Sequence, residues 1–114
     1  MSVTLEDPDR MNLLGLMLGN VIARNLARGA GRKLRGHVVV RAGEMVVTIK
    51  LAGDQVAIAR GAVDPIRAEV SGSMEALLAL ALGGGMIGPW LAGRLRTRGS
   101  LLLLLGLRPL LQVD

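Results

Sequence analysis

The apolar positions near the start of this chain recur every three or four residues, which is the period of a helix. Between Pro8 and Arg28 they share one side, while Asn20 and Arg24 fall on another. Asp7 can cap such a helix and Pro8 suits its first position. The pattern predicts a long N-terminal helix over residues 8–28, with these residues on its apolar side: Met11, Leu14, Leu18, Val21 and Ile22.

From His37 the period becomes two, the period of strands. Three strands are predicted over about 37–41, 44–51 and 55–60, separated by turns that contain Gly43 and Gly53. In the second strand Glu44, Thr48 and Lys50 lie on one side, and the other side carries Met45, Val47, Ile49 and Leu51. These three strands are expected to form an antiparallel meander with one face in water.

Asp64-Pro65 precedes a fourth predicted strand, over about 66–70. A fifth, over about 94–98, follows from arginines that alternate with Leu95 and Thr97. Helices are predicted over about 73–83, 88–92 and 100–107, with Ser73 and Ser100 as caps. The order is helix, three strands, strand, two helices, strand, helix.

The two main helices of the second half are apolar on every side. A helix of this kind needs cover on more than one side. A chain of 114 residues supplies one core of two layers and too little protein to cover both sides. The missing cover is expected to be a lipid ligand, a membrane or another protein chain.

The composition limits the kinds of molecule that this chain is expected to bind. The formal net charge of +5 suits anionic headgroups or nucleic acid. Trp90 is the only aromatic residue, so the stacking platforms of single-strand binding are missing and no nucleic-acid partner is expected. The opening residues do not resemble a signal peptide, and the apolar runs are too short to span a membrane. The expected location is cytoplasmic.

Candidate chemistry is sparse. His37 is the only histidine, cysteine and tyrosine are absent, and the acidic residues are scattered singly. Ser71, Ser73 and Ser100 occupy turn and cap positions, where hydroxyls satisfy backbone groups. No catalytic residue, metal site or cofactor is therefore expected.

Several segments together resemble the sterol carrier protein 2 family of lipid-binding domains. They are Asp64-Pro65, the Val-Ser-Gly-Ser run at 70–73 before a leucine-rich helix, Gly93, and the Arg-Leu-Arg-Thr-Arg-Gly-Ser run at 94–100. The match covers about 34–107. It implies an α+β fold in one domain, residues 1–114, in which a mixed five-stranded sheet has helices packed on one face and an apolar cavity lies between them. Relatives bind sterols, fatty acids or fatty acyl-CoA, and some bacterial relatives serve isoprenoid quinone synthesis.

With this resemblance, the apolar residues of the sheet and of the later helices become candidate lipid-binding residues; a solid core is the alternative. From the sheet they are Met45, Val47, Ile49, Val56 and Ile58. From the helices they are Leu77, Leu78, Ala81, Met86, Ile87, Trp90, Leu91, Leu102 and Leu105. A headgroup at the mouth could meet Arg94, Arg96, Arg98 or Arg108, for which plain solvent exposure is the alternative.

Two functions follow from this reading. The first is a non-enzymatic protein that holds a fatty acyl, sterol-like or isoprenoid ligand and exchanges it by transient contact with anionic membranes. The alternative is an interaction module of the same fold that forms a homodimer or docks on a lipid or quinone biosynthesis enzyme.

Overall fold

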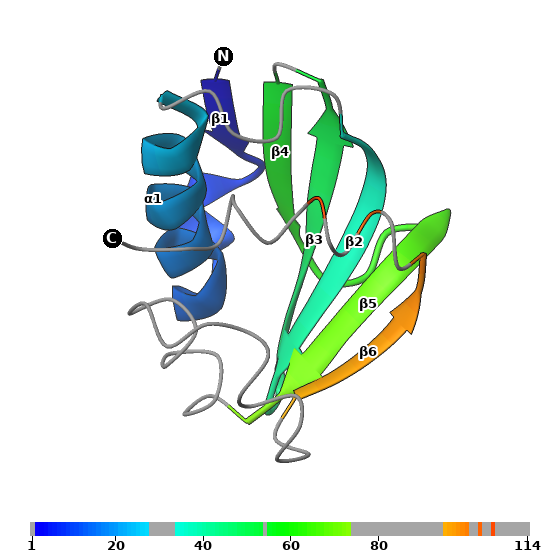
Figure 1. The fold of residues 1–114 in the computed structure, drawn as a ribbon. Helices are drawn as coiled ribbons and strands as arrows, with labels where there is room; N and C mark the ends of the chain where they lie inside the picture. Colours follow the sequence, from blue (N-terminus) through cyan, green and yellow to red (C-terminus); the bar gives the residue numbers. More distant parts are fainter. Residues whose placement is uncertain are drawn as a thin grey trace.

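A six-stranded sheet organises the computed structural model, which describes residues 2–27, 34–53, 55–73 and 95–100 together with Leu103 and Gly106 (Figure 1). The elements, in chain order, are β1 (Ser2–Leu5), a 3-10 turn (Pro8–Arg10), α1 (Leu13–Ala27), β2 (Arg35–Ala42), β3 (Met45–Ala52), β4 (Gln55–Arg60), β5 (Ile66–Gly72) and β6 (Leu95–Gly99).

The strand order is β1-β4-β3-β2-β5-β6. β1 runs parallel to β4 and β2 parallel to β5, and the other neighbours are antiparallel. The mixed sheet and the β2–β3–β4 meander are therefore confirmed, but the expected number of five strands was wrong. The missed strand is β1, whose Val3 and Leu5 pack against the core. Four residues at the start of a chain carry too little alternation to identify a strand.

The first helix begins later than the sequence pattern predicts. Instead of capping it, Asp7 accepts a hydrogen bond at its carbonyl from the Arg10 N–H (2.9 Å), which closes a single 3-10 turn. The cap of α1 is Asn12, whose Oδ1 accepts from the Gly15 N–H at 2.9 Å. Its Nδ2 also donates to the Val46 carbonyl of β3 at 3.3 Å. Asn12 forms the cap because its side chain can hydrogen-bond the first turn of the helix and the sheet at the same time.

Strand ends differ from the predicted ones by a few residues. β2 extends to Arg35 and Ala42, β5 extends to Gly72, and β6 ends at Gly99. The predicted helices over 73–83 and 88–92 lie outside the described residues from residue 74 onward. Of the helix predicted over 100–107, Leu103 and Gly106 are helical, and the Ser100 Oγ accepts from the Leu103 N–H at 3.2 Å as a cap does.

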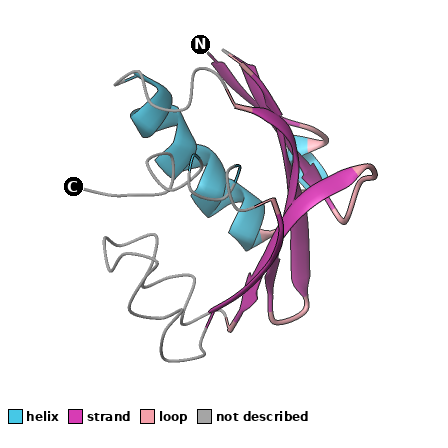
Figure 2. Cartoon of the chain, turned by 45° about the vertical axis from the view of Figure 1, so that its right-hand side comes forward, coloured by secondary structure: helices cyan, strands magenta, loops and turns pink. Residues whose placement is uncertain are grey.

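α1 lies against one face of the sheet, called the inner face below (Figure 2). Two glycines allow the close approach. A Cβ on Gly15 would lie 3.3 Å from Val47 Cγ1, and one on Gly19 would lie 3.2 Å from Leu5 Cδ2. A side chain at Gly19 would crowd Leu5 of β1, and one at Gly15 would meet the Met11 side chain as well as Val47 of β3.

The opposite, outer face is only partly exposed to solvent. This corrects the expectation that one whole face of the meander would be in water. Thr48 and Val39 have no exposed surface there. The connection from β4 to β5 crosses this face: the Thr48 hydroxyl donates to the Gly61 carbonyl (2.7 Å) and accepts from the Val63 N–H (2.9 Å). Residues 61–65 thus cover the middle of the outer face.

Candidate functional site

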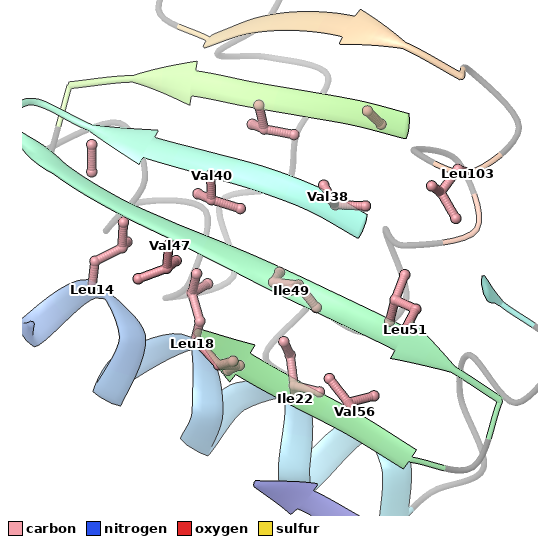
Figure 3. Packing of buried hydrophobic residues seen from close by; sticks show 14 of the residues in the cluster. Leu14, Leu18, Ile22, Val38, Val40, Val47, Ile49, Leu51, Val56 and Leu103 are labelled. Atoms are coloured by element: carbon pink, nitrogen blue, oxygen red, sulfur yellow. The ribbon is translucent and has the colours of Figure 1, made fainter. Parts of the chain in front are cut away.

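The inner face of the sheet is a continuous apolar surface built from alternate residues of four strands. Its central members are Val38, Val40, Ala42, Met45, Val47, Ile49, Leu51, Val56, Ile58, Ala68 and Val70. All except Met45 belong to one cluster of buried residues, most of which is drawn in Figure 3, and the half-buried Met45 packs against that cluster. The face includes all five sheet residues that the sequence singled out as lipid-binding candidates.

One half of this face is occupied by α1. Leu14, Leu18 and Ile22 of the helix are buried and point toward the sheet (Figure 3). The positions of Gly15 and Gly19 place Val47 and Ile58 directly beneath the helix. Long branched side chains fill the layer between helix and sheet here, as in a solid core.

The other half, on β2 and β5, carries shorter side chains. Val38, Val40, Ala68 and Val70 are each at most 1% exposed, so they are covered. At the start of β2, a Cβ placed on Gly36 would lie 2.7 Å from Arg67 Cδ and 3.4 Å from Leu103 Cδ2, so both side chains reach this end of the half. Because valine and alanine fill less of an interlayer space than leucine and isoleucine, this half is the better floor for an apolar ligand.

The lipid-binding candidates from the sequence do not include these four floor residues. The Val38-Val39-Val40 run is apolar at every position, so alternation cannot show which residues face inward. Only the register decides, since Val38 pairs with Ile49 and with Ala68. Nine other candidates lie outside the described residues: Leu77, Leu78, Ala81, Met86, Ile87, Trp90, Leu91, Leu102 and Leu105.

Two of the candidate headgroup arginines lie away from this floor. Arg96 pairs with Ser71 and Arg98 with Glu69, and Glu69 forms an ion pair with Arg41. On β5, Ser71 and Glu69 alternate with the inward Val70, and on β2 Arg41 follows the inward Val40. Arg96 and Arg98, which lie opposite Ser71 and Glu69, are therefore on the outer face. They cannot stand at the mouth of an inner cavity. Arg94 and Arg108 lie outside the described residues.

Polar groups near the inner face are few. Asn25 of α1 is 6% exposed, and the sequence pattern did not distinguish it from the solvent-facing Asn20 and Arg24.

His37 lies on the outer face, where its Nδ1 is 3.0 Å from the Val63 carbonyl. A carbonyl only accepts, so this nitrogen carries the proton and the ring fastens the crossover segment.

Among the residues that the structure describes, no cluster of three or more acidic or histidine side chains could hold a metal ion. Nor does the described part of the chain contain a helix long and apolar enough to cross a bilayer.

Known structures share this fold. A UbiJ-SCP2 ubiquinone synthesis protein aligns with 86% of this chain and 85% of its own (18% identity, TM-score 0.60). The palmitated SCP2L2 of Aedes aegypti, solved in solution, aligns with 91% of this chain and 97% of its own (17% identity, TM-score 0.62). The inverting sec-alkylsulfatase Pisa1 of a Pseudomonas species also matches 78% of this chain, which corresponds to 14% of the sulfatase (14% identity, TM-score 0.60).

No protein-family model matches the sequence, and no curated protein matches it. The chain therefore has the fold of sterol carrier protein 2-like domains over most of its length, and the fold is what these comparisons establish.

Proposed function

We propose that this chain is a non-enzymatic, cytoplasmic lipid-binding protein that holds a fatty acyl, sterol-like or isoprenoid ligand against the inner face of its sheet. The observation that supports the proposal is the apolar floor on β2 and β5, which consists of the short side chains Val38, Val40, Ala68 and Val70. The fold shared with a palmitated SCP2L2 supports it. The sulfatase offers little support for catalysis, because only a small part of that enzyme resembles this chain.

Burial of an alkyl chain supplies enough free energy for such a role. Each buried methylene contributes about 0.8 kcal/mol, so a chain of about 14 carbons contributes roughly 10 kcal/mol before the costs of binding. Micromolar affinity requires about 8 kcal/mol. No fixed charge on the inner face is needed, and we expect loose specificity within apolar ligands.

A tryptophan on the floor tests the location of the ligand. Ala68 of β5 is 1% exposed and faces inward, so Ala68→Trp should fill the space above the floor and abolish saturable uptake of a fluorescent fatty acid, with little loss of stability. Ala52→Trp, at an exposed strand end, is the matched control and should bind as the parent does.

If the interior is solid instead, Ala68→Trp should overpack it and lower the unfolding free energy by about 1–3 kcal/mol. That loss, together with absent uptake by the parent protein, contradicts the proposal.

One observation on α1 supports a second function, that of an interaction module. Leu13 and Leu16, one helical turn apart on α1, are 57% and 41% exposed. An apolar helix surface of this kind suits a homodimer or docking on a lipid or quinone biosynthesis enzyme, and the UbiJ-SCP2 ubiquinone synthesis protein has this fold. If α1 forms such an interface, light scattering of the parent should give a dimer that Leu13→Gln/Leu16→Gln converts to a monomer. A monomeric parent rejects the homodimer.

A further inference from the structure

The outer face carries a polar hollow that the lipid floor does not explain. It has a volume of about 180 Å³ and is lined by Glu69 and Ser71 of β5 and by Arg96 and Arg98 of β6. The register fixes this grouping, since Ser71 lies opposite Arg96 and Glu69 opposite Arg98. The whole thickness of the sheet separates the hollow from the inner face.

The acidic side chain of the hollow already has a charged partner, whereas its two basic side chains do not. Glu69 is half-buried and is engaged by Arg41 of the neighbouring strand β2. Within the described part of the chain, Arg96 and Arg98 are exposed and have no ion pair or hydrogen bond of their own. With Arg41 neutralising Glu69, both remaining guanidinium groups are available to an anion, and the Ser71 hydroxyl can donate a hydrogen bond beside them.

We propose that this hollow binds the phosphate of an anionic phospholipid when the protein sits on a membrane surface. The proposal deepens the lipid-binding function by naming the contact through which ligand exchange would occur. Guanidinium groups offer paired donors that match the oxygens of a phosphate. Side chains two residues apart on a strand are about 7 Å apart and point the same way, so Arg96 and Arg98 can hold one phosphate between them or one each.

The position of β6 favours a surface as the partner. β6 is the last strand of the sheet order, and it lies at the side of the molecule away from β1 (Figure 1). Because β6 is at the end of the described sheet, the exposed Arg96 and Arg98 of the hollow can approach a plane of headgroups. Nucleic acid fits less well, because stable binding uses many phosphate contacts or aromatic stacking, and the sequence contains one aromatic residue.

Co-sedimentation with vesicles tests the proposal. The parent protein should bind phosphatidylcholine vesicles that contain phosphatidylglycerol and not vesicles of phosphatidylcholine alone. Each arginine near an anionic surface contributes about 1 kcal/mol, so Arg96→Gln/Arg98→Gln should weaken partitioning roughly thirty-fold. Glu69→Gln should strengthen partitioning, because it removes the negative charge in the hollow.

The matched control is Arg10→Gln/Arg60→Gln, which removes the same charge from the β1–β4 side of the sheet. It should partition within about threefold of the parent, since salt screens distant charges. Equal losses in the two double variants would show an effect of net charge alone and overturn the proposal. So would tighter binding to a DNA duplex than to vesicles, or competition by millimolar inorganic phosphate that abolishes vesicle binding.

Fatty acid uptake separates this proposal from the proposed function. Arg96→Gln/Arg98→Gln should take up a soluble fluorescent fatty acid as the parent does, because the altered side chains lie across the sheet from the floor. A parent that binds anionic vesicles through these arginines but takes up no lipid would reject the lipid floor and keep the hollow. A parent that takes up lipid but does not bind the vesicles would reject the hollow as a membrane contact and keep the lipid floor.

Discussion

At the scale of single residues, buried polar groups fix how the chain crosses the sheet. Thr48 has no exposed surface, and its hydroxyl satisfies both the Gly61 carbonyl and the Val63 N–H. The His37 ring holds the same segment at the Val63 carbonyl. These contacts hold residues 61–65 over the outer face and lead the chain to β5, the strand that carries the buried Ala68 and Val70.

Thr48→Val keeps the shape of this side chain and removes its hydroxyl. Two backbone groups then lose their partner, so the free energy of unfolding should fall by about 1–3 kcal/mol in chemical denaturation. Thr4→Val, at an exposed position of β1, is the control and should change stability little. An unchanged stability of Thr48→Val would mean that water or another group replaces the hydroxyl.

A second residue-scale prediction concerns Gly99, where β6 ends. Its φ is +88°, and a Cβ there would lie 2.2 Å from the Arg67 carbonyl oxygen. Gly43 also has a positive φ, of +60°, but nothing lies within 4 Å of its added Cβ. Gly43→Ala should cost about 1–2 kcal/mol through backbone conformation alone. Gly99→Ala should cost clearly more, measured by the same denaturation, because the backbone of β5 must also shift; equal costs would contradict the tight approach of β6 to β5.

At the scale of elements, α1 depends on a cap that also fastens it to the sheet. Asn12 joins the N-terminus of the helix to β3 through its two amide atoms. The docked helix then buries Leu14, Leu18 and Ile22. Asn12, the two glycines that face the sheet and these buried side chains together hold the helix against one half of the inner face.

Asn12→Ala removes both contacts and should destabilise the protein by about 1–2 kcal/mol. Asn20→Ala, at an exposed position of the same helix, should leave stability unchanged or raise it slightly, because alanine is the better helix former. Thermal and chemical unfolding of the two variants give the comparison. Similar effects of the two substitutions would argue that Asn12 is not the cap.

The sequence predicted elements well where periodicity is strong. The strand from Met45 to Leu51 alternates cleanly, and its predicted inward residues are the observed ones. Asp7 was a plausible cap by residue type, but the choice of Asn12 depends on the Val46 carbonyl, which is distant in sequence. β1 was missed because its stability comes from pairing with β4, a contact that local pattern does not contain.

At the scale of the whole molecule, the sheet separates two surfaces of opposite character. The inner face is apolar and partly covered by α1, whereas the outer face carries the crossover segment and the arginine-lined hollow. The sequence predicted the apolar surface and the fold of sterol carrier protein 2-like domains. It could not predict the sides on which Arg96 and Arg98 lie, because alternation within one strand defines two faces without saying which is inward.

The most direct test of the account is native mass spectrometry of the protein as purified, with lipid analysis of its solvent extract. The account predicts a population carrying one bound apolar lipid, which Ala68→Trp lacks and Ala52→Trp retains. A protein that is ligand-free as purified, and that stays ligand-free after incubation with fatty acid, sterol and polyprenol, would contradict it.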